Sequence, residues 1–185
     1  GTLTQGRPSL VDQQGVDGHE DARTLLLAAA VEAGSEHPLA RAVVDAARQT
    51  GRTVPAASDF AAHPGGGVSA TVDGQHVLVG SPAFLGSQHV DTHALDAVVE
   101  AYRRRGATAI VVAVDGRPAS VLAIADPLKA TTAGAIEDLR RRGMKVVMLT
   151  GDNATTSRAI ADELRIDQVV ADVLPDQKHG HVQAL

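Results

Sequence analysis

Apolar residues in the first third of the chain recur at the spacing of two amphipathic helices. Residues 21–33 place leucine and alanine on one side every three to four positions, and Gly34 ends the pattern. Residues 38–49 repeat the pattern, with Pro38 at the first helical position and Gly51 just beyond the last. The sequence therefore predicts two consecutive helices.

The middle of the chain has the pattern of β-structure interrupted by turns. Residues 54–79 and 109–125 contain short apolar runs, and Asp73-Gly74 and Asp115-Gly116 each separate two such runs. An Asp-Gly pair fits the two-residue primed turn of a β-hairpin, because both of its residues tolerate a positive φ. We predict two hairpins, with a third helix over 91–105 between them.

After Ala125 the pattern changes to strands that alternate with helices. The predicted elements are strands at 119–125, 145–149 and 169–170, and helices at 127–142, at 154–165 and after Pro175. Nearly all-apolar strands in such an alternation are typical of a parallel sheet covered on both faces. The chain is therefore predicted to be α/β, with an α+β insert and part of a doubly wound parallel-sheet domain.

Composition and charge narrow the class of protein. Hydrophobic residues make up 44% of the 185 positions, aromatic residues 2%, and no apolar run approaches the roughly 20 residues that cross a bilayer. The net charge of −5 argues against duplex nucleic acid as a partner. Each of the basic triplets 103–105 and 140–142 precedes a glycine, which is typical of a solvated helix end. These observations predict a soluble, monomeric polypeptide.

Three segments of the second half carry residue types that suit phosphoryl chemistry. The tetrapeptide 150–153 (Thr-Gly-Asp-Asn) follows a predicted strand and opens a helix, where a hydroxyl beside helix N-terminal amides can hold a phosphoryl oxygen. Asp126 and Lys129 also follow a strand, and Lys178 could neutralise charge on a phosphoryl group. Taken singly, these segments also fit an ordinary turn capped by Asn153, an N-cap, and a surface lysine.

Together, and in this order, these segments resemble the phosphorylation domain of P-type ATPases, which belongs to the haloacid-dehalogenase-like superfamily. The opening residues Gly-Thr-Leu-Thr-Gln-Gly resemble the tail of that family's Asp-Lys-Thr-Gly-Thr-Leu-Thr signature. The resemblance implies that the aspartate that accepts phosphate precedes Gly1, and that a Mg²⁺-binding Gly-Asp-Gly segment follows Leu185. We therefore expect these 185 residues alone to bind ATP but to be inactive as a hydrolase.

The predicted insert resembles the heavy-metal-transporting branch of the same family. Glu32 and the run 35–40 (Ser-Glu-His-Pro-Leu-Ala) are similar to one of its signatures, and the glycine-rich run 64–68 is similar to another. Singly, a His-Pro pair is a weak signal, since His63-Pro64 is a second one. The branch follows its next glycine with Asn, whereas Gly80 here precedes Ser81. The resemblance implies nucleotide-binding roles for Glu32, His37, Gly65, Gly67, Val68 and Gly80.

The resemblance also implies the wider assignment. The fold class is a partial haloacid-dehalogenase-like parallel-sheet domain with an inserted α+β nucleotide-binding domain. Its expected boundaries are 1–8 for the start of the phosphorylation domain, 9–118 for the insert and 119–185 for the incomplete remainder. Thr150, Gly151, Asp152 and Lys178 are implied to be catalytic, with Asp126, Lys129 and Asn153 in support.

The implied parent is a copper-type metal-transporting P-type ATPase, on the cytoplasmic face of a membrane. It would use ATP and Mg²⁺, form an aspartyl-phosphate and work with actuator and transmembrane domains. The alternatives are a phosphatase of the same superfamily with a cap domain, and a non-catalytic nucleotide-binding module. The chain has no cysteine, and its closely spaced histidines lack a third convergent ligand, so no metal site is expected within it.

Overall fold

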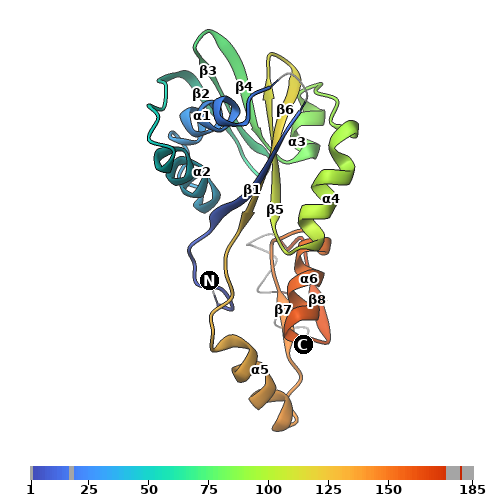
Figure 1. The fold of residues 1–185 in the computed structure, drawn as a ribbon. Helices are drawn as coiled ribbons and strands as arrows, with labels where there is room; N and C mark the ends of the chain where they lie inside the picture. The colour runs from blue at the N-terminus through green and yellow to red at the C-terminus, as the bar shows by residue number, and fades with distance from the viewer. Residues whose placement is uncertain (1, 17–18, 174–179, 181–185) are drawn as a thin grey trace.

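The computed structural model of the chain describes residues 2–16, 19–173 and 180. Figure 1 shows two parts, a larger one built on a six-stranded sheet and a smaller α/β part beyond one end of that sheet. Two stretches of chain join them: residues 2–8 lead into the larger part, and residues 126–131 lead from it to the smaller part. The expected α/β class with an α+β insert is confirmed.

The larger sheet is antiparallel throughout, with strand order β1-β6-β5-β4-β3-β2. Its strands are β1 (Ser9–Gly15), β2 (Ala57–His63), β3 (Gly67–Val72), β4 (Gln75–Gly80), β5 (Thr108–Val114) and β6 (Arg117–Ala125). Both predicted hairpins are confirmed. In each Asp-Gly pair both residues have positive φ, as the primed turn requires: 50° and 76° at Asp73-Gly74, 48° and 78° at Asp115-Gly116.

Helices cover both faces of this sheet. On one face lie α1 (Asp21–Glu32) and α2 (Pro38–Gln49), and on the other lie α3 (Pro82–Ser87), the 3₁₀ turn η1 (His93–Leu95) and α4 (Asp96–Arg104). Alternate residues of the central strand β5 serve the two faces, so that Val112 packs beneath α1 and α2 while Val111 packs beneath α3 and α4. A strand with two buried faces has to be apolar along its buried length, as β5 is from Ala109 to Val114.

The smaller part is a two-stranded parallel sheet with two helices. Its elements are α5 (Thr132–Arg141), β7 (Val147–Leu149), α6 (Ala154–Leu164) and β8 (Gln168–Val170). Among the described residues, its core consists of Ile136, Ala161, Leu164 and Ile166. None of the helices that the structure describes, in either part, is both long and apolar enough to cross a membrane.

Three details differ from the sequence predictions. The strand predicted at 119–125 does not open the parallel series, because β6 pairs with β1 and β5 in the antiparallel sheet. The domain boundary expected after residue 118 stays a prediction; that position lies within β6. The helix predicted from 127 begins at Thr132, because residues 127–129 pair with the N-terminal segment: Thr4 bridges Leu128. Strand β1 and helix α3 were not predicted, and the helix expected after Pro175 lies outside the described residues.

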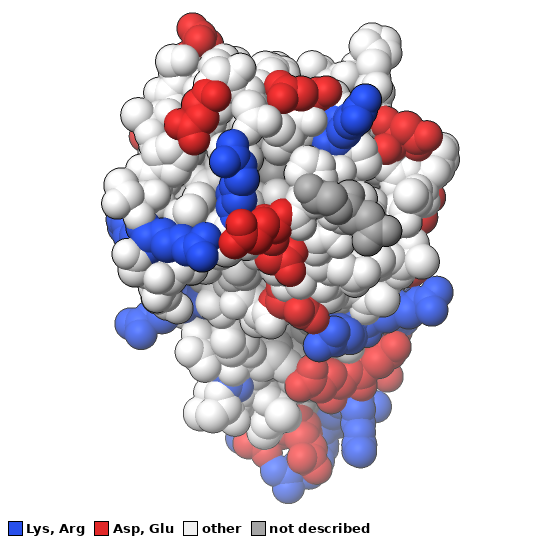
Figure 2. All heavy atoms as spheres, turned by 45° about the horizontal axis from the view of Figure 1, so that its top comes forward, with Lys and Arg blue, Asp and Glu red and all other residues white. Residues whose placement is uncertain are grey.

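Charged side chains of both signs are mixed over the face drawn in Figure 2, and neither sign forms a broad continuous patch there. Both basic triplets end helices as predicted. Helix α4 ends at Arg104 and α5 at Arg141, and the glycines that follow, Gly106 and Gly143, each have a φ of 75°.

Candidate functional site

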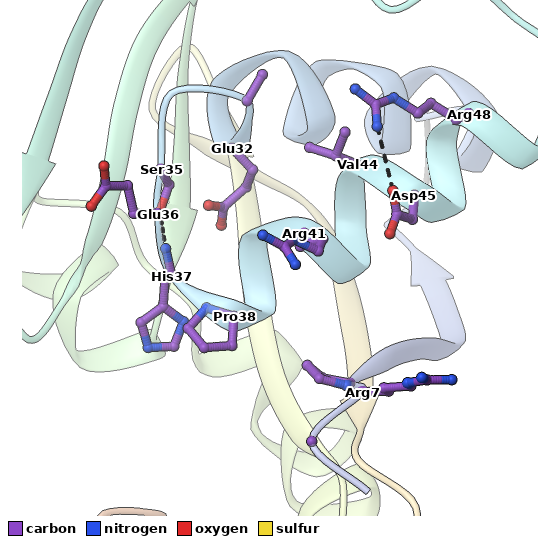
Figure 3. A pocket seen from close by; sticks show the side chains of 13 residues that line it. Arg7, Glu32, Ser35, Glu36, His37, Pro38, Arg41, Val44, Asp45 and Arg48 are labelled. Carbon is purple, nitrogen blue, oxygen red and sulfur yellow. Dashed lines mark hydrogen bonds and ion pairs between the residues drawn. The ribbon is translucent and has the colours of Figure 1, made fainter. Parts of the chain in front are cut away.

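A cleft of about 600 Å³ lies where α1 ends and α2 begins. Glu32, Ser35, His37 and Arg41 line one side of it, and residues 6–8 of the incoming linker line another. Figure 3 shows these side chains on the two helices and the loop between them, with Arg7 on the linker below. The cleft is therefore placed between the inserted domain and the connection to the smaller part.

Glu32 is a buried carboxylic acid at the last position of α1. Its side chain is only 7% exposed, and burial raises the pKa of Glu32 to about 7, although a hydrogen bond from Ser35 favours the charged form. The hydroxyl of Ser35 also accepts the backbone N–H of His37, at 3.3 Å. Ser35 therefore links the acid to the start of the next helix, a role that the sequence prediction did not assign to it.

His37 is the N-cap of α2. Its backbone is extended (φ −66°, ψ 141°), and its Nδ1 accepts the N–H of Leu39 at 3.2 Å. Because Nδ1 is an acceptor here, the neutral ring carries its proton on Nε2. The ring is exposed, and none of the described residues bonds Nε2, so both a ring face and a donor are available to a ligand.

The second His-Pro pair has a different environment. His63 ends strand β2, its Nε2 lies 3.0 Å from the hydroxyl of Ser69, and its ring packs against Phe84 at 4.9 Å between centroids. Internal partners therefore occupy both the ring nitrogen and one face of His63. The two His-Pro pairs therefore differ in the structure: the ring of His37 is exposed, whereas the ring of His63 has internal partners.

The glycine-rich loop joins β2 to β3 and lies beside Phe84. Gly65 has a φ of 74° with open space around it, and it lines a second hollow of about 440 Å³ together with His63 and Ser81. Gly67 and Gly80 are paired across β3 and β4, and a side chain on Gly80 would come within 2.6 Å of the Gly66 carbonyl oxygen. These two glycines permit close packing of the backbone.

The residues predicted to bind adenosine thus lie in different parts of the surface. Glu32 and His37 share the first cleft, Gly65 lines the second, and no described residue lines both. The side chain of Val68 is buried under α1 and α2, so only its backbone faces a possible ligand. Ser81 caps α3 by accepting the N–H of Phe84 at 3.1 Å.

The loop Thr150–Asn153 is held in one conformation by hydrogen bonds on several sides. The Thr150 hydroxyl donates to the Asp152 carboxylate at 3.0 Å and accepts the Asp152 N–H at 3.1 Å. Asn153 caps α6 through the N–H of Thr156. A hydroxyl has one proton to donate, so Thr150 would have to leave Asp152 in order to donate to a phosphoryl oxygen.

Gly151 lies close to the backbone of the segment after β8. A side chain there would stand 3.3 Å from the Val173 carbonyl oxygen, so it would fit only with a small shift of that neighbour. Lys178, the fourth residue expected in this site, lies outside the described residues. Among the described residues, no group of three histidine or carboxylate side chains is arranged to hold a metal ion.

Asp126 and Lys129 bind the incoming linker, and neither caps α5. The Asp126 carboxylate accepts the N–H groups of Gly6 and Arg7, each at 3.0 Å, and Lys129 donates to the Thr2 carbonyl at 3.1 Å. Burial by itself raises the pKa of Asp126, but hydrogen bonds from Thr4 and from those two amides outweigh it and lower the pKa below its usual value. The expectation that Asp126 is a helix N-cap is therefore wrong.

Comparison with known proteins gives a consistent picture. Residues 1–185 match the family model of haloacid dehalogenase-like hydrolases. The chain is 44% identical over 185 residues to the copper-transporting ATPase 2 of Rhizobium meliloti (strain 1021), covering all of this chain and 22% of the relative. A crystal structure of a zinc-transporting PIB-type ATPase matches 99% of this chain and 29% of its own, with a TM-score of 0.73 and 33% identity.

A third comparison covers about two thirds of this chain. The crystal structure of the N-domain of HMA6, a copper-transporting P-type ATPase, matches 64% of this chain and 98% of its own, with a TM-score of 0.52 and 25% identity. The chain spans about a fifth of the length of the curated relatives it matches. On these findings the chain belongs to the haloacid dehalogenase-like hydrolase family, and along its whole length it is similar to the catalytic region of metal-transporting P-type ATPases.

Proposed function

We propose that this chain is the ATP-binding region, with part of the phosphoryl-transfer region, of a copper-type heavy-metal-transporting P-type ATPase. The intact pump would couple ATP hydrolysis, through an aspartyl-phosphate, to metal export across a membrane. The observation that carries the proposal is the pairing of Glu32 and His37 in one cleft, joined through Ser35. The similarity of the chain to copper- and zinc-transporting relatives supports the heavy-metal class.

The chemistry of the cleft fits adenine. The edge of adenine offers an amino donor beside ring-nitrogen acceptors. A carboxyl whose pKa is about 7 is present in both forms near neutral pH, so Glu32 can accept from the amino group or donate to a ring nitrogen. His37 adds an exposed aromatic face and a free Nε2–H. Filling the cleft would also give the buried acid a second partner besides Ser35.

The remaining nucleotide contacts are proposed from the glycine-rich loop. Gly65, Gly67, the backbone of Val68 and Gly80 would approach the ribose and adenine, because backbone without side chains permits close contact. A bound nucleotide would then contact residues of both hollows, which no described residue lines together. The proposed unit for this binding is the six-stranded part, residues 9–118 with the end of β6.

Phosphoryl transfer is assigned to the loop Thr150–Asn153 together with Lys178, with Asp126 and Lys129 in support. Thr150 would hold a phosphoryl oxygen after releasing Asp152. When bound, Mg²⁺ would neutralise phosphate charge. Asp126 and Lys129 act at a distance, by fixing the linker that enters the inserted domain.

Calorimetry with ATP on two matched variants tests the proposal. His37→Gln removes the free Nε2–H and the ring, and we expect the dissociation constant to rise roughly five- to thirtyfold, as for the loss of a hydrogen bond of about 1–2 kcal/mol. His63→Gln, at the internally bonded His-Pro pair, should change affinity less. Equal losses, or a loss only at His63, would place adenine elsewhere. A wild-type chain with no ATP binding would favour the phosphatase alternative.

A further inference from the structure

The loop Thr150–Asn153 is bonded to the inserted domain as well as to its own part of the molecule. Helix α6, which begins directly after this loop, packs against α4 and the turn that leads into β5. Gly106 lies in that turn, and a side chain there would stand 3.6 Å from Ile160 of α6. This contact joins the two parts independently of the linkers at 2–8 and 126–131.

A buried hydroxyl lies at the centre of this contact. Thr156, in the first turn of α6, is 2% exposed, and its Oγ1 donates to the carbonyl oxygen of Ala107 at 3.1 Å. The same Oγ1 accepts from Asn153 Nδ2 at 2.9 Å. A threonine within a helix often bonds a carbonyl of its own preceding turn. The hydroxyl of Thr156 instead bonds a carbonyl 49 residues away, in the inserted domain.

The bonds form a continuous chain from the loop to the sheet. Asn153 closes the loop by capping α6, and its amide bonds Thr156, which bonds Ala107 at the entrance to β5. On the other side, the backbone of Asp152 accepts from Ser157 Oγ and from the N–H of Asp172. The carbonyl of Ala107 and the amide of Asn153 would lose this partner together if the hydroxyl of Thr156 were removed.

We infer that Thr156 is a positioning residue that fixes the loop Thr150–Asn153 by anchoring it to the inserted domain. The inference rests on the proposed function in one respect, namely that the loop acts in phosphoryl transfer. It predicts that the conformation of the loop depends on docking of α4 against α6. Separation of the two parts then loosens the loop even where its own sequence is unchanged.

The first test measures amide hydrogen exchange by NMR in the absence of nucleotide. Thr156→Val keeps the shape of the side chain but removes the hydroxyl, and we expect exchange at Asp152 and Ser157 to accelerate about tenfold, as for the loss of one buried hydrogen bond. Exchange in β4 and β5 should stay as in the wild type. Thr156→Ser restores the hydroxyl and should restore protection. Thr155→Val is the control for the link to the loop: its hydroxyl also crosses to the inserted domain, donating to Glu100 of α4 at 3.3 Å, but among the described residues it makes no bond to Asn153, so exchange at Asp152 should change less.

A second test measures docking directly. The chain has no cysteine, so spin labels at Gln49→Cys and Asp138→Cys, both exposed helix positions, report one distance between the two parts. The distribution of this distance should widen with Thr156→Val and return to the wild-type width with Thr156→Ser. Asn153→Asp keeps the helix cap but removes the amide donor, so it should give a smaller increase in exchange at Asp152. This variant and Thr156→Ser decide the question if the valine variant does not fold.

The outcomes separate this inference from the proposed function. Wild-type exchange at Asp152 in both Thr156→Val and Asn153→Asp, with an unchanged distance distribution, would overturn the positioning role of Thr156. Equal acceleration of exchange at Asp152 in Thr155→Val and Thr156→Val would overturn it as well, because a bond across the contact that does not reach Asn153 would then have the same effect on the loop. The absence of ATP binding in the wild type would instead overturn the proposed function and leave the exchange result standing.

Discussion

The two parts of the molecule differ in how completely they enclose their apolar residues. Among the described residues, the six-stranded part has a cluster of 20 buried apolar residues between the sheet and α1 and α2, and a second cluster of 13 between the sheet and α3 and α4. The described residues of the α/β part form a cluster of four, with Val173 also buried, and its two strands are three residues long. The larger part therefore has a core of its own, whereas the smaller one depends on its neighbours.

Those neighbours are visible in the structure. Leu3 and Leu128 pack against the small core, and the Thr132 hydroxyl donates to the Leu3 carbonyl at 2.7 Å. On the other side, α6 is bonded to the inserted domain through Thr156. Nucleotide binding is therefore proposed for a part that has its own core, and phosphoryl transfer for a part that is stabilised by contacts with its neighbours. Three experiments probe this difference.

Hydrogen exchange should show the largest contrast. We expect amides in 20–115 to open far more rarely than those in 120–173, because local opening is easiest where few apolar contacts are lost. Strand β6 is the exception within the second range, since it lies inside the large sheet. Exchange of the whole chain followed by mass spectrometry gives the comparison. Uniform protection across both parts would show that the smaller part is stable by itself.

Paired core truncations sharpen the contrast. Leu122 is fully buried in β6 and Leu164 is 6% exposed in α6. Leu122→Ala should lower the free energy of unfolding of the large sheet by about 2–5 kcal/mol, the usual range for such a cavity. Leu164→Ala should unfold the small part and leave the sheet intact. Urea titrations followed by NMR signals from both parts test this, and loss of the sheet in Leu164→Ala would show that the two parts fold as one unit.

Glu32 gives a smaller effect that depends on pH. Between about pH 4.5 and 7 the native state holds a proton that the unfolded state releases, so the penalty for the buried charge grows as the pH rises. Glu32→Gln removes this penalty. The variant should match the wild type near pH 4.5 and exceed its stability at pH 8 by on the order of 2 kcal/mol.

Thermal unfolding at the two pH values measures this effect, and Glu36→Gln, at an exposed neighbouring carboxylate, is the control. A gain of the same size at both pH values would mean that Glu32 is not held as a neutral acid. Because the same change removes a proposed adenine partner, Glu32→Gln should also weaken ATP binding. Stability and binding would then move in opposite directions at one residue.

Sequence patterns predicted the elements whose signals are local. The bounds of α2 follow from Pro38 and Gly51, and the hairpin turns follow from Asp-Gly pairs. The pairing of Glu32 with His37 was expected from their shared motif. Ser35 as the link between them could have been found, because a hydroxyl two residues before an N-cap commonly bonds a nearby backbone amide.

Long-range pairing explains what was missed. Asp126-Pro127 has the pattern of a helix start, yet the N-terminal segment takes the carboxylate and pairs with Leu128, so α5 begins later. Strand β1 lacks a clear alternation because it is an edge strand with an irregular register at Leu10–Asp12. No local pattern indicates that Thr156 bonds Ala107, since the partner is a backbone carbonyl.

The register of β1 and β6 has a consequence for how the molecule can be assembled. Ser9 and Ala125 face each other across one strand spacing, about 5 Å, so the inserted domain enters and leaves the smaller part at nearly the same point. For the smaller part, the whole inserted domain is therefore equivalent to a short loop with its two ends held side by side. Folding of the larger sheet brings those ends together and so offsets the entropic cost of closing the loop. Such a module can change in size or be exchanged for another without altering the chain geometry of its host.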